Sequence, residues 1–165
     1  MSEVIPALHN VFSVEIVKQF AKICYGLGFK TVVVSKPSGA AAQAGVPEAQ
    51  KLALKKGRVL VVLSELEDVI EIFKPSLLLF VTSKKYAKER FDVERVISET
   101  QKGPIVVVFG GSEPGISAKD MELGVSMHID VDDDLGPLGF AAIVLHIISK
   151  SLKERECSIE GGSKT

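Results

Sequence analysis

A glycine-rich segment that directly follows an apolar run is the first candidate for chemistry. It reads Phe109-Gly110-Gly111-Ser112-Glu113-Pro114-Gly115-Ile116-Ser117. Glycine lets a loop backbone approach a ligand closely and present its amide donors, and ligands of parallel α/β sheets usually bind at strand ends. The segment lacks the Lys-Ser/Thr pair of a P-loop and the glycine spacing of the dinucleotide fingerprint. It therefore indicates a ligand-binding loop of another kind, with a tight structural turn as the alternative.

A second candidate segment runs from Met127 to Ala142 and combines a histidine with four aspartates. His128 and Asp130 precede the run Asp132-Asp133-Asp134, after which Leu-Gly-Phe-Ala-Ala opens an apolar stretch. Adjacent strand residues point to opposite faces and no second histidine lies nearby, so we expect no metal site here. The acidic run either offsets the positive charge of a ligand or forms a solvated loop.

The elements that must position these segments alternate between β-branched runs and helical periodicity, which is typical of a mostly parallel sheet with helices on both faces. We expect about six strands, at Val4–Leu8, Lys30–Ser35, Arg58–Leu63, Ser76–Thr82, Ile105–Phe109 and Ser126–Val131. The helices are expected from Ser13 to Leu27, Pro47 to Lys56, Glu65 to Phe73, Tyr86 to Ser98 and Gly136 to Glu156. Ser13 is a candidate N-cap, and Ser64 with Glu67 forms a capping-box pattern.

Composition bounds the class of protein. The chain has 165 residues, of which 46% are hydrophobic, and these values are typical of one globular domain. Twenty basic and 21 acidic residues give a net charge of -1, which excludes nucleic-acid binding by bulk positive charge. Two cysteines and no apolar run near 20 residues favour a cytoplasmic protein without membrane spans. We expect a single domain over residues 1–156 and a flexible tail over residues 157–165.

The order of these segments resembles the last two motifs of the SpoU branch of the SPOUT RNA methyltransferases. The shared pattern is a strand, Gly-Gly-Ser-Glu-Pro-Gly-Ile-Ser, a short acidic helix, a strand ending in His-Ile-Asp, and Leu-Gly-Phe-Ala-Ala at the start of a helix. The resemblance, best over residues 104–150, implies an S-adenosylmethionine-dependent methyltransferase of rRNA or tRNA. It also implies an α/β fold with a C-terminal trefoil knot, and here a divergent stand-alone member of archaeal style.

The resemblance also implies a cofactor pocket. Its residues would be Thr82 after the fourth strand, the glycine loop, and two apolar positions around the adenine. Carried over by position, the cofactor-binding set is Thr82, Gly110, Gly111, Ser112, Glu113, Gly115, Ile129 and Leu138. Replacing Gly111 with valine is then expected to remove cofactor binding and to leave the fold intact.

The catalytic positions follow the family less closely. The family's first motif pairs an Asn with an Arg six residues later, whereas this chain pairs Asn10 with Ile16. The expected catalytic residues are Asn10 as an orienting group and Lys18 or Lys22 as the cation, with His9 as a further candidate. Where the family reads Ser-Leu-Asn this chain reads Pro137-Leu138-Gly139, so two polar groups of the third motif are missing.

Partners are expected from local charge and from the apolar final helix. RNA would contact the basic cluster Lys84, Lys85, Lys88 and Arg90 through its phosphates, and Lys51, Lys55, Lys56 and Arg58 would extend that surface. With no tryptophan and two tyrosines, base stacking on an aromatic platform is not expected. A homodimer contact would come from Phe140, Leu145 and Ile148.

Two functions remain open at this stage. The first is RNA methyl transfer. The second is a catalytically inactive SPOUT-fold protein that binds a nucleotide, S-adenosylmethionine or RNA, and the departures at Ile16, Pro137 and Gly139 favour it. A metal-dependent nuclease would need an Asp followed by Glu-x-Lys, and no Glu-x-Lys occurs in the chain, so this class is not expected.

Overall fold

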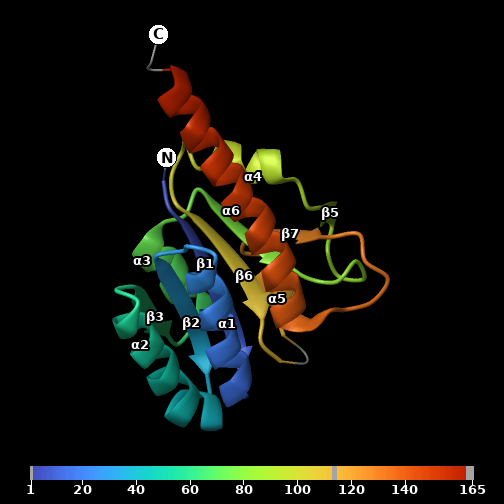
Figure 1. Ribbon diagram of the computed structural model, residues 1–165. Helices are drawn as coiled ribbons and strands as arrows, with labels where there is room; N and C mark the ends of the chain where they lie inside the picture. The colour runs from blue at the N-terminus through green and yellow to red at the C-terminus, as the bar shows by residue number, and fades with distance from the viewer. Residues whose placement is uncertain (1, 113–114, 163–165) are drawn as a thin grey trace.

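The computed structural model describes residues 2–112 and 115–162, and its strands form one parallel sheet (Figure 1). The strand order is β3-β2-β1-β6-β4-β7-β5, and every pairing between these strands is parallel. The strands are β1 (Val4–Val11), β2 (Thr31–Pro37), β3 (Val59–Leu63), β4 (Leu77–Val81), β5 (Glu89–Arg90), β6 (Ile105–Gly110) and β7 (Val125–His128). The predicted α/β class with a mostly parallel sheet is confirmed.

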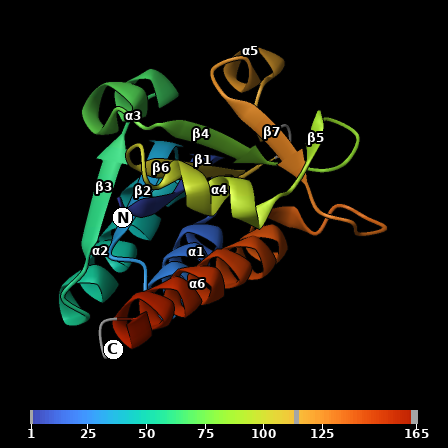
Figure 2. The same ribbon diagram turned by 90° about the horizontal axis from the view of Figure 1, so that it is seen from above.

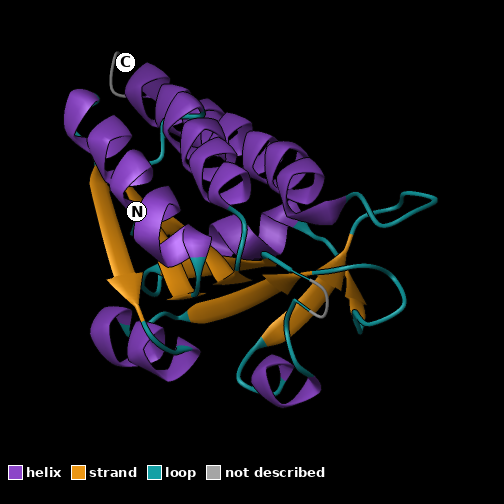
Figure 3. Cartoon of the chain, turned by 90° about the horizontal axis from the view of Figure 1, so that it is seen from below, coloured by secondary structure: helices purple, strands orange, loops and turns teal. Residues whose placement is uncertain are grey.

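Helices cover both faces of this sheet, as parallel strands require. One face carries α1, α2, α4 and α6, and the other carries α3 and α5 (Figures 2 and 3). The helices are α1 (Val14–Gly26), the π-helical turn η1 (Ala41–Gly45), α2 (Val46–Lys55), α3 (Leu66–Phe73), α4 (Val93–Glu99), α5 (Ala118–Met121) and α6 (Gly136–Gly162). None of the described helices is both long enough and apolar enough to span a membrane.

The segment between β4 and α4 differs most from the sequence prediction. A helix was expected from Tyr86, but α4 begins only after Asp92, whose side chain accepts hydrogen bonds from the amides of Glu94 and Arg95. The preceding residues instead form a loop and the two-residue strand β5, which pairs with β7. The sheet therefore has seven strands, one more than predicted.

The ends of several elements also differ from prediction. Ser13 caps α1 as expected, since its hydroxyl accepts from the Ile16 amide at 3.3 Å. The capping box of α3 lies one residue further along than predicted and pairs Glu65 with Asp68. β7 ends at His128 instead of residue 131, η1 precedes the predicted start of α2, and α6 continues through Gly162.

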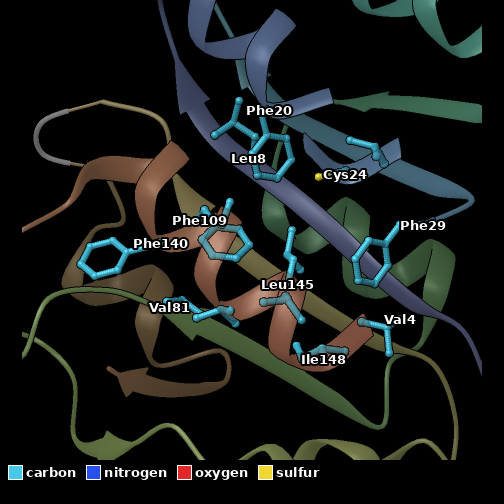
Figure 4. Packing of buried hydrophobic residues seen from close by; sticks show 14 of the residues in the cluster. Val4, Leu8, Phe20, Cys24, Phe29, Val81, Phe109, Phe140, Leu145 and Ile148 are labelled. Carbon is cyan, nitrogen blue, oxygen red and sulfur yellow. The ribbon is translucent and has the colours of Figure 1, made fainter. Parts of the chain in front are cut away.

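The larger core lies between the sheet and the helices on the face that carries α1 and α6 (Figure 4). Phe20 of α1 and Phe109 of β6 meet edge to face, with ring centroids 5.8 Å apart. Phe140, Leu145 and Ile148 of α6 are buried in this same core. The prediction that these three side chains supply a dimer contact is therefore wrong, because the chain's own sheet covers them.

Candidate functional site

The glycine loop folds back onto the end of β6. A Cβ added at Gly115 would meet the Cα of Gly110 at 2.8 Å and the carbonyl oxygen of Ser112 at 2.9 Å. Both contacts are with backbone atoms, so neither can be relieved by a side-chain rotation. The backbone at Gly115 approaches the backbone at Gly110 this closely only because both residues lack side chains.

The tip of β1 holds this loop in place. Asn10 has a positive φ of 59°, its Nδ2 donates to the Gly115 carbonyl at 3.3 Å, and its own carbonyl accepts from the Ser112 hydroxyl at 2.8 Å. The amide of Gly111 donates to the His9 carbonyl at 2.8 Å. The structure thus gives Asn10 a role in shaping the loop, which the sequence motif alone did not indicate.

The loop forms one wall of a cavity of about 1030 Å³ at the carboxyl ends of β4 and β6. The other walls come from the β4–β5 segment, from α5 with the start of β7, and from the start of α6. The lining residues are Ile16, Val81, Thr82, Tyr86, Lys88, Glu89, Phe109, Gly110, Gly111, Ser112, Gly115, Ile116, Ser117, Ala118, Met121, Glu122, Gly124, Val125, Ser126, Asp134, Gly136, Pro137 and Phe140. The position agrees with the general rule that ligands of open parallel sheets bind at strand carboxyl ends.

Most of the predicted cofactor residues come together in this cavity. Its walls include Thr82, Gly110, Gly111, Ser112 and Gly115. By contrast, the other two described members, Ile129 and Leu138, are half-buried against the core and do not line it. The remaining member, Glu113, lies outside the described residues.

Gly111 packs against the end of β1, which the sequence did not predict. A Cβ at this position would meet the Cβ of Val11 at 2.7 Å and the carbonyl oxygen of Asn10 at 3.1 Å. A valine would therefore push against β1 and strain the fold, so the expectation that Gly111→Val leaves the fold intact is wrong.

The predicted cationic candidates do not reach the cavity. Lys18 lies on α1 with its Nζ 3.3 Å from Glu15, and Lys22 is exposed one turn later. Neither lysine lines the cavity. Ile16, at the position where the SpoU resemblance predicts an arginine, does line the cavity, so an apolar side chain faces it there.

The residues of the predicted basic cluster lie in the segment that contributes Tyr86, Lys88 and Glu89 to the cavity wall. Lys84, Lys85, Lys88 and Arg90 are exposed in the segment from β4 to β5, and Lys88 also lines the cavity. Arg90 is ion-paired with Asp130, which ties this segment to the loop before α6.

The lysines and the arginine around the start of β3 do not extend this cluster. β3 and β5 form opposite edges of the sheet, six strand spacings of about 4.8 Å apart, or roughly 30 Å. The expectation of one continuous basic surface that includes Lys51, Lys55, Lys56 and Arg58 is therefore wrong.

His9 links the end of β1 to β2 and α5. Its side chain is 2% exposed, its Nδ1 lies 2.8 Å from the Ser35 hydroxyl, and its Nε2 lies 3.5 Å from Asp120 Oδ2. The neutral tautomer with its proton on Nε2 satisfies both contacts. Burial lowers the pKa of His9 below 6.5; Asp120 and more weakly Glu65 oppose this shift, and Lys36 adds to it.

Burial of His9 makes the free energy of unfolding decrease at lower pH. Because the folded state resists a proton that unfolded His9 accepts, the free energy of unfolding should fall as the pH drops from 7.5 through 6.5 towards 5.5. Urea unfolding of wild type and His9→Gln at several pH values measures this contribution. The variant should show the shallower dependence, and parallel curves for the two proteins would contradict this assignment of His9.

Potential metal ligands do not cluster among the described residues of the site. Within residues 2–112 and 115–162, no three His, Cys, Asp or Glu side chains lie close enough together to hold an ion. His128 and the nearby aspartates, considered as ligands in the sequence, belong to this described part.

Comparisons with solved structures establish the fold. The "Probable Methyltransferase" from Bordetella pertussis Tohama I superposes with a TM-score of 0.72 and 18% identity, over 92% of this chain and 96% of that one. The SpoU methyltransferase AviRb from Streptomyces viridochromogenes, in complex with AdoMet, gives a TM-score of 0.71 and 12% identity, over 93% and 62%. The predicted likeness to SpoU methyltransferases is confirmed at the level of the fold.

Sequence comparisons point to a different name. A protein of Aeropyrum pernix named "Putative type II restriction enzyme ApeKORF2002P" is 40% identical over 151 residues, covering 88% of this chain and 92% of that protein. A family model described as "RecB-family nuclease (DUF2122)" matches residues 39–147. The fold of the chain is like that of the SpoU methyltransferases. By sequence, the chain belongs to the DUF2122 family, whose model is described as a RecB-family nuclease.

Proposed function

We propose that this protein is an S-adenosylmethionine-dependent RNA methyltransferase acting on rRNA or tRNA. The observation that carries the proposal is the cavity of about 1030 Å³ walled by the glycine loop and the start of α6. Pockets for small molecules commonly enclose roughly 300–1000 Å³. The cavity is thus large enough for the donor, and the close approach of Gly110 and Gly115 leaves the loop backbone beside it.

The charges around the cavity support a cationic ligand. Among the described residues that line it, Glu89, Glu122 and Asp134 are acidic and Lys88 is basic, and Arg95 forms an ion pair with Glu89. The formal charges of the four lining residues sum to -2, or to -1 once Arg95 is included. S-adenosylmethionine carries a net positive charge because its sulfonium and ammonium groups outnumber its carboxylate. An acidic lining attracts such a ligand and holds the neutral demethylated product less strongly.

Methyl transfer requires alignment of donor and acceptor and a group or solvent water that takes the acceptor's proton, and the donor leaves as S-adenosylhomocysteine. S-adenosylmethionine, when bound, supplies an already activated methyl group. The chain must hold the acceptor atom in line with that group and exclude competing water. Thr82, Ser112 and the loop backbone would hold the donor, and Asn10 keeps the loop in shape through its bonds to Gly115 and Ser112. Lys18 and Lys22 stay predictions as catalytic groups.

RNA would approach over the basic cluster in the segment that lines the cavity. Replacing Lys84 and Lys85 with glutamate should weaken binding of bulk transfer RNA and flatten its salt dependence, since each lost phosphate contact lowers the log-log slope by about 0.7–0.9. Fluorescence anisotropy at 50–300 mM salt measures both quantities. Lys55→Glu with Lys56→Glu, at the other sheet edge, is the matched control. Identical slopes for the two double variants would remove the Lys84–Lys85 cluster from the interface.

A second candidate function is binding without methyl transfer, and Ile16 favours it. This apolar side chain lines the cavity at the position where SpoU methyltransferases carry a cation. A transfer assay with methyl-labelled donor and total RNA separates the two candidates. Label incorporated into RNA supports the enzyme, whereas a protein that binds the donor and labels no RNA supports the binding module.

The description of the DUF2122 family as a nuclease implies a different kind of site, one that holds metal ions. A metal-dependent nuclease needs clustered carboxylates, and the described residues hold no such cluster. The chain also contains no Glu-x-Lys sequence. The side chains present are thus better suited to a donor pocket than to a nuclease centre.

Four further properties stay predictions within this proposal. They are the C-terminal trefoil knot, a homodimer, a cytoplasmic location, and the division into one domain over residues 1–156 with a tail over residues 157–165. The knot follows from the resemblance to the SPOUT family, and the dimer would use surfaces other than the buried side of α6.

A further inference from the structure

Tyr86 stands at the edge of the cavity on a segment that is held at several points. Its amide and that of Ala87 donate to the Ser83 carbonyl at 3.0 and 3.1 Å, which forms a tight turn. Two residues after the ring, the Lys88 amide donates to the Ser126 hydroxyl of β7 at 3.1 Å. The backbone on both sides of Tyr86 is therefore anchored, and the ring projects from a defined position.

The ring is open to solvent although it lines the cavity. Tyr86 is 55% exposed, whereas the chain's other tyrosine, Tyr25, is 4% exposed and donates its hydroxyl to the Val59 carbonyl at 2.8 Å. The Nζ of Lys85 lies 5.4 Å from the Tyr86 ring centroid. The Lys85 ammonium stands over one face of this exposed ring, so a flat ligand that carries negative charge would stack on the other face.

We propose that Tyr86 is a stacking platform for a nucleobase of the acceptor RNA. This inference rests on the proposed function and names how its substrate is recognised. Bases stack on exposed aromatic rings, and the neighbouring lysines Lys84, Lys85 and Lys88 are placed to meet the phosphates on either side of the stacked base. Because Tyr86 and the glycine loop line one cavity, a base stacked there reaches the space in which the donor would lie.

Composition alone does not predict a stacking platform. The scarcity of aromatic residues argued against base stacking, but a single ring is enough when it lines the reaction cavity. The acceptor would then be RNA with at least one unpaired nucleotide, since a base inside a duplex cannot reach a protein ring.

Substitutions at Tyr86 test the platform by affinity. Binding of a mixed-sequence single-stranded RNA oligonucleotide is measured by anisotropy for wild type, Tyr86→Leu and Tyr86→Phe. We expect Tyr86→Leu to bind roughly 5- to 100-fold more weakly, and Tyr86→Phe to stay within about twofold of wild type. Phe12→Leu is the matched control, because Phe12 is also 55% exposed but does not line the cavity.

Three other results would contradict the proposal. Equal affinities for wild type and Tyr86→Leu overturn the platform. Equal losses in Tyr86→Leu and Tyr86→Phe also overturn it, since the hydroxyl and not ring stacking would then matter. A DNA oligonucleotide of the same sequence that binds as tightly overturns the assignment to RNA. Wild-type binding of S-adenosylmethionine, measured in parallel, reports on the proposed function separately, so the two failures are distinguishable.

Tyrosine emission gives an independent readout. The chain has two tyrosines and no tryptophan, so Tyr86 is the only tyrosine of a Tyr25→Phe variant. Stacking of a base on the ring should quench this emission in proportion to the RNA bound. Undiminished emission at saturating RNA would show that the base lies elsewhere.

Discussion

Alanine at Gly115 is expected to lower the methyl-transfer rate on the order of 100-fold. Its Cβ would stand 2.8 Å from the Cα of Gly110 and 2.9 Å from the Ser112 carbonyl oxygen, so backbone must move to admit it. A displacement of about 1 Å at a reaction site commonly costs this much in rate. The same movement would disturb the hydrogen bond from Asn10 Nδ2 to the Gly115 carbonyl. Donor affinity should fall as well, by tenfold or more.

Two controls separate this local effect from general unfolding. Overpacking of this size costs about 1–3 kcal/mol, which urea unfolding of Gly115→Ala measures directly. Gly26→Ala is the matched variant, because nothing lies within 4 Å of its added Cβ at the end of α1. Gly26→Ala should keep wild-type donor affinity. A folded Gly115→Ala protein that binds the donor as tightly as wild type would remove the glycine loop from the site.

Phe109→Ala is expected to have the largest effect on stability. The side chain is fully buried, meets Phe20 edge to face at 5.8 Å, and belongs to the central strand β6 directly before the glycine loop. Truncation of a buried phenylalanine costs about 3–5 kcal/mol, a large part of the roughly 5–15 kcal/mol that stabilises a typical domain. Chemical unfolding in urea gives the difference in free energy.

The exposed ring of Phe12 provides the comparison for this prediction. Phe12→Ala should change the free energy of unfolding by no more than about 0.5 kcal/mol, because this ring is largely solvated. Should Phe109→Ala fail to fold, Phe109→Leu keeps most of the apolar volume and should lose about 1–2 kcal/mol. A loss below 0.5 kcal/mol in either Phe109 variant would contradict the packing in Figure 4.

The central strands could be predicted from sequence because their signal is local. Runs such as Thr31-Val32-Val33-Val34 and Ile105-Val106-Val107-Val108 are apolar without alternation, as strands buried on both sides require. β5 could not be predicted in this way. Its two residues, Glu89 and Arg90, have no strand propensity of their own and are placed by pairing with Met127 and His128, which lie about 38 residues away.

The candidate site shows the same division between local and distant determinants. The glycine content of the loop indicated a ligand-binding site from sequence alone, and five of the predicted cofactor residues line one cavity. The partners that shape the loop come from far along the chain, since Asn10 contacts Gly115 and Ser112 across more than 100 residues. His9 meets Asp120 of α5 in the same way. Without knowledge of which strands are neighbours, these contacts could not be predicted.

The nuclease description and the SpoU-type fold lead to different expectations for the same residues. A nuclease would use carboxylates to hold metal ions, whereas a methyltransferase would use Glu89, Glu122 and Asp134 only as a negative lining. Among the described residues, no three potential metal ligands lie close together. Binding of the methyl donor is therefore the property on which the two expectations differ most.

Calorimetric titration of the purified protein with S-adenosylmethionine and S-adenosylhomocysteine tests this property most directly. We expect saturable, one-to-one binding in the micromolar range, with the cationic donor bound at least as tightly as the neutral product because of the acidic lining. Binding should weaken at least tenfold in Gly115→Ala and stay at the wild-type level in Gly26→Ala. No heat of binding at millimolar ligand, from protein that unfolds cooperatively in urea, would contradict the assignment of the cavity to a methyl donor.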